Sequence, residues 1–166
     1  MLGPIYALFV EEVGGDLLDA SFSGAAFALA AALTTLVSGY YSDKIKRDEI
    51  LVVAGYLTIG LGFLLFTVVS SIWSLLLVQV IIGFGEAVSA PAFDELYSGN
   101  LDKSEVGREW GAWEAMQYLS TGFGAIIGGL IATKLGFNPL FILMAALCFA
   151  SAFYIFFLPK KFLHPS

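Results

Sequence analysis

The sequence predicts an all-α bundle of membrane-spanning helices, and two observations lead to this prediction. The 166 residues are 58% hydrophobic and 13% charged, with a mean hydropathy of +0.85. This composition leaves too little polar surface to cover a water-soluble globule. Several uncharged stretches can also cross a membrane, since a helix that rises about 1.5 Å per residue needs about 20 residues to span about 30 Å of hydrocarbon.

The first element that we expect is the end of a transmembrane helix over residues 1–12. This stretch is apolar as far as Val10, but it is only half as long as a span, and the polar residues 11–16 follow it. A signal peptide would begin with basic residues and end at a small-residue cleavage site, and the stretch has neither feature. We therefore expect that the beginning of this first helix is missing from the sequence.

Three complete spans are expected next. Residues 20–41 lie between Asp19 and Asp43 and contain no charge and no proline. Residues 50–85 are again uncharged, but as one helix they would be roughly 54 Å long, which is too long for one crossing. Serines and an interfacial tryptophan at residues 70–74 indicate where the chain turns, which predicts spans over 50–69 and 74–97.

Two further spans complete the predicted domain. One covers residues 110–133 and ends at a predicted turn over residues 134–139, and the other covers residues 140–158 and ends before Pro159. All 166 residues thus form a single transmembrane domain with five complete helices and the end of a first.

The basic residues predict the orientation in a cell membrane, either an inner or a plasma membrane. Cytoplasmic loops collect Lys and Arg. Threading the spans alternately leaves only Lys134 on one side, and the side with the other basic residues is therefore the cytoplasm, which also holds the C-terminus. These residues are Lys44, Lys46, Arg47, Lys103, Arg108, Lys160 and Lys161.

Several classes of function are disfavoured by the residues present. A net charge of −6 argues against nucleic acid as a partner, whereas membrane lipid is an expected one. Cys148 lies within an apolar span and His164 in a polar tail, so we expect no metal site and no cofactor. No phosphate-binding loop and no Ser–His or Cys–His pair at membrane depth is seen, so we do not expect an enzyme.

The most specific motif lies in the segment of nine residues that begins at Gly39. Gly39, Asp43, Lys44 and Arg47 resemble the Gly-x-x-x-Asp-Arg/Lys-x-Gly-Arg/Lys signature of the major facilitator superfamily, although Lys46 replaces its second glycine. The resemblance implies a cytoplasmic gate that is latched in one state and released in the other, with Gly39 permitting close helix approach. Alternatively, the basic residues only determine the topology.

Two more segments are similar to the same family. Residues 79–86 resemble its Arg-x-x-x-Gly-x-Gly segment, with Gln79 in place of the arginine, and residues 107–112, which include Arg108, resemble the start of its fifth helix. The resemblance implies that the chain is one six-helix half of a fold that normally has two. The partner it implies is a second six-helix half, from another copy or another chain.

Polar side chains at membrane depth indicate where a transport pathway would lie. A carboxylate at the bilayer centre costs several kcal/mol, and Glu86 lies roughly 18 Å from the outer end of its predicted span. Gln79, two turns earlier, shares its helical face, so both can line a hydrated pathway. Alternatively, Glu86 packs helices together or carries protons. Gln117 and Tyr118 are candidates for substrate contact, although tyrosine is also common at membrane interfaces.

Three acidic residues lie at the predicted cytoplasmic boundary: Asp94, Glu95 and Glu114. They are either solvated there or paired with basic residues such as Arg47 and Arg108, and Glu95 is the acid that we assign to the gate. Glycines within the spans indicate close helix packing. The glycines concerned are Gly55, Gly60, Gly62, Gly124, Gly128 and Gly129.

The resulting functional prediction is half of a secondary transporter that moves a small solute by alternating access. The substrate is not predicted. The alternative is a non-transporting or degenerate membrane scaffold, or a fragment of a longer transporter with twelve helices. A membrane enzyme would need a catalytic cluster that this sequence does not show.

Overall fold

The computed structural model describes residues 5–42 and 47–159. Over these residues the chain is helical, without strands, and five of the helices are long and apolar enough to cross a membrane. The prediction of an all-α membrane bundle is therefore confirmed. The helices are α1 (Tyr6–Glu12), α2 (Leu17–Ser42), α3 (Asp48–Phe66), α4 (Ile72–Gly99), α5 (Val106–Leu135) and α6 (Phe137–Phe157).

Two of the predicted turns differ from the observed ones. The break between α3 and α4 falls at residues 67–71, because Ser71 caps α4: its Oγ accepts from the backbone N–H of Ser74, and the Ser74 hydroxyl lies within reach of the Ser71 N–H. Gly136 alone separates α5 from α6, with a φ of +86° that favours glycine. Pro139 lies in the first turn of α6, where a missing N–H costs no helical hydrogen bond.

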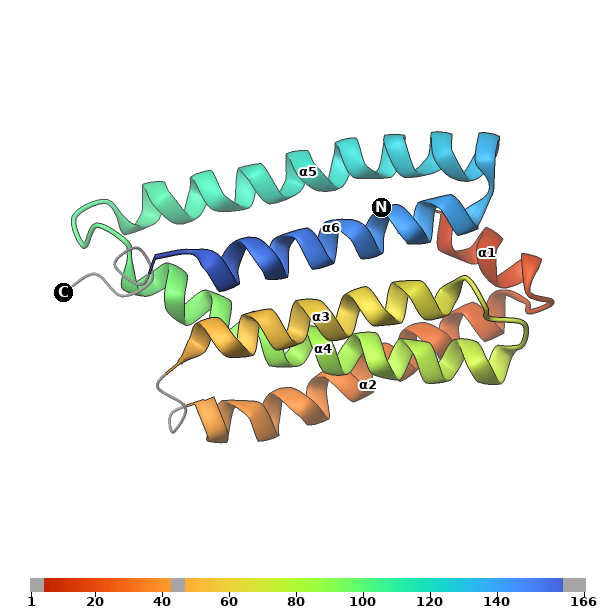
Figure 1. The fold of residues 1–166 in the computed structure, drawn as a ribbon, viewed down its shortest axis with the longest axis horizontal. Helices are drawn as coiled ribbons and strands as arrows, with labels where there is room; N and C mark the ends of the chain where they lie inside the picture. Colours follow the sequence, from red (N-terminus) through yellow and green to blue (C-terminus); the bar gives the residue numbers. More distant parts are fainter. Residues whose placement is uncertain (1–4, 43–46, 160–166) are drawn as a thin grey trace.

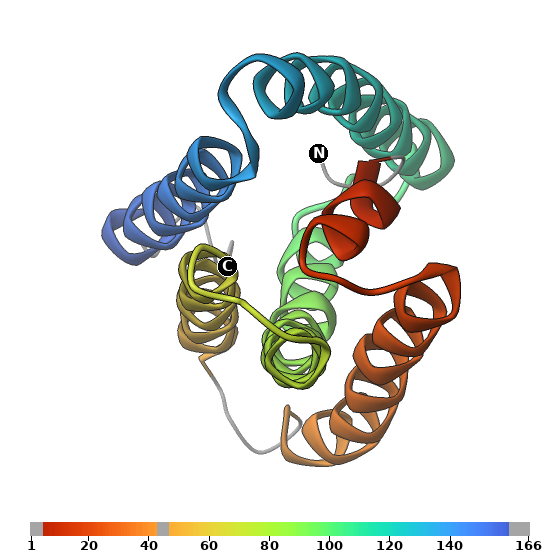
Figure 2. The same ribbon diagram turned by 90° about the vertical axis from the view of Figure 1, so that its right-hand side faces the viewer.

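Helix α4 is the centre of the bundle. It packs extensively against α2 and α3, and α3 also packs along α6, whereas α5 has contacts mainly with α6 (Figures 1 and 2). Only Gly124 and Gly128 of α5 are buried. Figure 2 shows α1 on the inner side of the bundle, between α2 and α5. The helices thus form a tightly packed group, α2, α3, α4 and α6, and a more loosely attached α5.

Glycines allow α4 to approach both of its neighbours closely. A Cβ on Gly83 would lie 2.5 Å from the backbone oxygen of Phe27 in α2, and a Cβ on Gly55 of α3 would lie 2.6 Å from the backbone oxygen of Gly85. No side chain fits at such distances without a shift of backbone, so small residues are required there. The prediction of close packing is confirmed for Gly55, whereas Gly129 of α5 has nothing within 4 Å of a built Cβ.

The short helix α1 is anchored by an aromatic cluster at one end of the bundle. The Phe9 ring lies 5.5 Å from the ring of Phe66 in α3 and 4.7 Å from that of Phe141 in α6, both in edge-to-face geometry. Such pairs contribute about 0.5–1.5 kcal/mol each beyond their burial. Val10, the next residue, is fully buried. These contacts tie α1 to α3 and α6.

A proline interrupts the hydrogen bonding of α4. Pro91 lies inside the helix and has no N–H, so the carbonyl of Ala87, four residues earlier, loses its usual partner. The hydroxyl of Ser38 in α2 donates to this carbonyl oxygen at 3.0 Å. A side chain of α2 therefore satisfies the backbone group that the proline leaves open.

Candidate functional site

A cavity of about 380 Å³ lies between α3, α4 and α5, toward the end of the bundle where α4 is joined to α5. The residues that α4 and α5 contribute recur at intervals of three and four, so each helix presents one continuous stripe to it. The lining residues are Tyr56 and Ile59 of α3, Glu86, Ser89, Ala90, Phe93 and Asp94 of α4, and Trp110, Trp113, Glu114 and Gln117 of α5.

Two of the residues predicted for the transport pathway, Glu86 and Gln117, line this cavity. Glu86 is the fifteenth of the 28 residues of α4, so it lies near the middle of that helix, roughly 21 Å from either end. Its side chain is exposed to the cavity. The described ion pairs involve neither Glu86 nor the two other acidic residues of the lining, Asp94 and Glu114.

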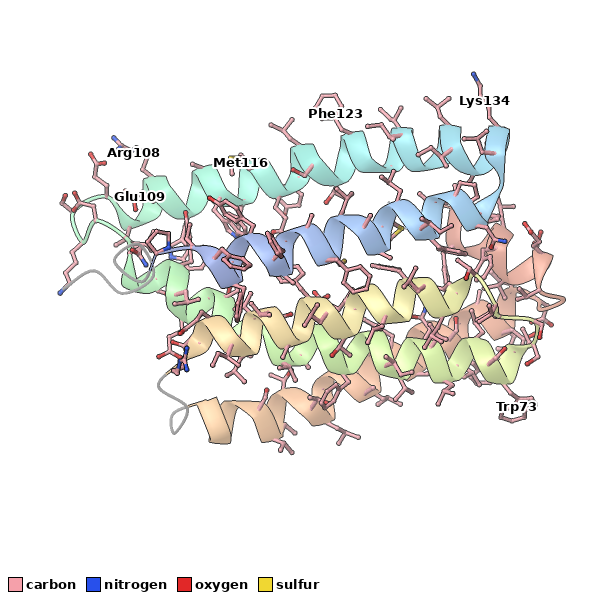
Figure 3. All side chains as sticks on the ribbon, in the orientation of Figure 1. Trp73, Arg108, Glu109, Met116, Phe123 and Lys134 are labelled. Atoms are coloured by element: carbon pink, nitrogen blue, oxygen red, sulfur yellow. The ribbon has the colours of Figure 1, made fainter. Side chains whose placement is uncertain are left out.

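Tyr118 follows Gln117 in the chain but faces the other way. Its side chain is 73% exposed and lies in a shallow apolar surface with Leu119 and Phe123. Figure 3 shows Phe123 pointing away from the other helices. Gln117 continues the stripe of Trp110, Trp113 and Glu114 along α5, whereas Tyr118, about 100° further round the helix, falls outside it. Tyr118 therefore lies on an exposed apolar surface, outside the cavity that contains Glu86.

Gln79 belongs to a different polar cluster. Its Nε2 donates to the Tyr6 hydroxyl of α1 at 2.7 Å, and that hydroxyl donates to the Ser23 Oγ of α2 at 2.8 Å. Gln79 does share the helical face of Glu86, as predicted, but it lies about 10 Å nearer the start of α4. The contact with Tyr6 shows that α1 lies beside α4 at that depth. Gln79 thus joins three helices and does not line the cavity.

Stacked aromatic rings form one wall of the cavity. The Phe93 and Trp113 rings of the lining stack with centroids 5.0 Å apart. Tyr97, which is not itself a lining residue, lies 5.3 Å from Trp113 and meets Trp110 edge-on at 4.9 Å. The Tyr97 hydroxyl also donates to the backbone oxygen of Glu109 at 2.9 Å. Sequence reasoning missed this wall. Its signal was the spacing of three between the tryptophans and of four between Phe93 and Tyr97.

The residues predicted to form the gate are only partly described. Asp43 and Lys44 lie outside the described residues. Gly39, near the end of α2, has nothing within 4 Å of a built Cβ, so it makes no close helix approach here, contrary to the expectation. The Arg47 Nε lies 3.2 Å from Oε1 of Glu49, a largely buried residue in the first turn of α3. A carboxylate at this position is also favoured by the helix dipole.

Arg108, at the start of α5, forms an ion pair with Glu105. The arginines of the predicted gate thus pair with acidic residues close to them in sequence, and neither pairs with Asp94, Glu95 or Glu114. The described ion pairs therefore give no cross-loop network.

The loop that leads into α5 is ordered by Asp102. The hydroxyl and the backbone N–H of Ser104 donate to the Asp102 Oδ1 at 2.7 and 2.8 Å and hold the pKa of that carboxyl below its ordinary value.

Comparison with known proteins identifies the family. The profile described as Major Facilitator Superfamily matches residues 1–165. The chain is 26% identical over 135 residues to the "Uncharacterized MFS-type transporter MJ1560" of Methanocaldococcus jannaschii, and the aligned region covers 81% of this chain and 35% of that protein. It is 25% identical over 157 residues to the "Multidrug resistance protein MdtG" of Salmonella typhimurium, and the aligned region covers 92% of this chain and 39% of that protein. No solved structure matches the chain.

The chain spans less than two fifths of the length of these curated relatives, at 35% and 39%. The family match, in contrast, extends over nearly the whole chain, and five described helices are able to cross a membrane. The resemblance that the motifs of the sequence carry is therefore confirmed. This chain belongs to the major facilitator superfamily and is a multi-pass membrane protein.

Proposed function

We propose that this chain forms one half of a secondary transporter that moves a small solute by alternating access. The observation that carries the proposal is the cavity lined by Glu86 and Gln117 between membrane-spanning helices. Polar and ionisable groups at membrane depth are costly, and they usually face a substrate pathway or a water-filled space. Membership of a family of transporters supports the same function.

The second half of the transporter is proposed to be another copy of the chain or another chain. Helix α2 is largely unburied and, like α5, presents exposed apolar side chains along its length. Such surfaces suit either lipid or a second bundle. The proposed orientation places the α4–α5 loop, the residues of the gate and the C-terminus on the cytoplasmic side, in agreement with the distribution of basic residues.

Site-directed labelling tests alternating access without knowledge of the substrate. In a Cys148→Ala background, Gln117→Cys places one thiol in the cavity, and Phe123→Cys places one on the outward face of α5. A membrane-impermeant thiol reagent is added to right-side-out and to inside-out vesicles. We expect the cavity thiol to react from both sides and the Phe123 position to react from neither. Reaction of the cavity thiol from one side only, or from neither, would contradict the proposal.

The alternative function is a non-transporting scaffold or a fragment of a longer transporter with twelve helices. The observation that favours it is the share of the relatives that the chain spans, 35% of one and 39% of another. The mass of the chain in nanodiscs, measured by native mass spectrometry, separates the two. A dimer, or a complex with a second chain, supports the two-half transporter, whereas a monomer with no partner supports the alternative.

A further inference from the structure

We propose that the cavity between α3, α4 and α5 binds an organic cation that carries an apolar, aromatic-sized body. This inference rests on the proposed function, because it names the class of solute that the transporter half would take. Three properties of the cavity lead to it: the sign of its charge, the chemistry of its wall and the spacing of its carboxyl groups.

The ionisable charge that lines the cavity is of one sign. Glu86, Asp94 and Glu114 contribute carboxyl groups, and none of the lining residues is a lysine or an arginine. The described ion pairs include none of these three carboxylates. In the low dielectric of a membrane protein, an unbalanced negative charge attracts a cation strongly and repels an anion. No basic side chain of the lining balances these carboxyl groups, so a bound cation would supply the missing positive charge.

The wall of the cavity is suited to an organic cation. Tyr56, Phe93, Trp110 and Trp113 are all among the lining residues, and the Phe93 and Trp113 rings stack beside one another. The faces of aromatic rings carry partial negative charge and attract cations, with tryptophan the strongest. The same rings remove the apolar body of the ligand from water. A volume of about 380 Å³ is within the usual range for small-molecule sites, about 300–1,000 Å³.

The carboxyl groups of the cavity do not gather into a cluster of the kind that holds a metal ion. The described residues contain no group of three or more His, Cys, Asp or Glu side chains that could hold a metal ion. Asp94 lies two turns along α4 from Glu86, about 12 Å, and Glu114 lies on another helix. Carboxylates distributed along an aromatic-lined cavity are suited to a delocalised charge on a larger body.

Tryptophan fluorescence can report on binding, because the chain has three tryptophans and two of them line the cavity. Trp73 lies at the opposite end of α4 and is 82% exposed, so Trp73→Phe leaves only Trp110 and Trp113. The probes are tetraphenylphosphonium and tetraphenylborate, which have nearly the same shape and opposite charge. The full chain is measured in nanodiscs, and empty nanodiscs correct for partitioning of each probe into lipid.

We expect saturable quenching by tetraphenylphosphonium and none by tetraphenylborate at equal membrane concentration. Glu86→Gln or Glu114→Gln should each weaken the apparent affinity by about tenfold, since each removes one attracting charge. The matched control is Glu12→Gln, which alters an exposed carboxyl group at the end of α1. Helix content by circular dichroism identifies any variant that fails to fold, and the second glutamate variant then provides the test.

Equal quenching by the two probes, or no quenching by either, would overturn the assignment of a cationic solute. In that case, labelling of the Gln117 position from both sides of the membrane would still support the proposed transport function. Conversely, saturable binding of the cation with labelling from one side only would retain the binding site and remove alternating access.

Discussion

At the scale of single residues, the break in α4 is repaired by one hydroxyl group. Pro91 deprives the Ala87 carbonyl of its helical partner, and the Ser38 hydroxyl of α2 supplies a replacement at 3.0 Å. Because Pro91 lies between the cavity residues Ala90 and Phe93, this contact also fixes the part of α4 that lines the cavity. The hydrogen bond therefore connects the packing of α2 to the shape of the site.

Replacing this hydroxyl should destabilise the bundle only while the proline is present. We expect Ser38→Ala to lower the free energy of unfolding by about 1 kcal/mol, since interhelical hydrogen bonds in membranes contribute about 0.6–1.7 kcal/mol. In a Pro91→Ala background the restored N–H satisfies the Ala87 carbonyl, so the same substitution should cost much less. Unfolding in bicelles measures this double-mutant cycle.

Ser21→Ala is the matched control for that cycle, because the Ser21 hydroxyl donates only within α2, to the Leu17 oxygen. Equal costs of Ser38→Ala in the two backgrounds would show that its hydroxyl does not act through the proline.

At the scale of helices, glycines of α4 and α3 determine how closely those helices pack, whereas Gly122 and Gly129 of α5 do not. Gly83 faces a backbone oxygen of α2, and Gly55 and Gly85 face one another's helices. Gly122 and Gly129 of α5 have open space around them. A glycine in a membrane helix therefore indicates close packing only where another helix lies against that face. α5 has contacts mainly with α6, so most of its glycines lack such a neighbour.

The two classes of glycine should respond in opposite ways to an added methyl group. Gly83→Ala places a Cβ 2.5 Å from the Phe27 oxygen, so backbone must move, and we expect a loss of about 1–3 kcal/mol. Gly122→Ala meets nothing within 4 Å and should be neutral or stabilising by up to about 1 kcal/mol, since alanine is the better helix former. Thermal unfolding in detergent compares them. A loss at Gly122 as large as that at Gly83 would argue against the packing described.

At the scale of the whole molecule, the membrane-spanning helices differ in how much of their apolar surface is buried inside the bundle. All five helices that can cross the membrane expose leucines, as lipid contact requires. Helix α2 is the least buried of them, with 6% of its most apolar window buried against 33% for α3. If two bundles form the transporter, part of the α2 surface is the natural place for the second bundle.

Bulky substitutions should distinguish a bundle contact from a lipid contact. Leu33 of α2 and Leu61 of α3 are both exposed leucines within membrane-spanning helices. A tryptophan disturbs a packed protein interface but is accommodated by lipid, so we expect Leu33→Trp to reduce the fraction of dimer and Leu61→Trp to leave it unchanged. Native mass spectrometry in nanodiscs provides the measurement. Equal dimer fractions in both variants would place the second bundle elsewhere.

The sequence by itself determined the class of fold, the number of complete spans and the family. Hydropathy and helical spacing are local properties, so they predicted five membrane-crossing helices and placed Gln79 and Glu86 on one face of the same helix. The motif around Gly39 and Asp43 predicted the family that the comparisons confirm.

The tertiary structure alone decided which side chains meet. Gln79 binds Tyr6 because α1 lies beside it, whereas Glu86, two turns away, faces Gln117 and the aromatic wall. The Ser38 contact to Ala87 likewise joins residues 49 positions apart. The physical reason is that a helix determines the direction of each side chain from local geometry, but its neighbour at that depth depends on how the other helices pack.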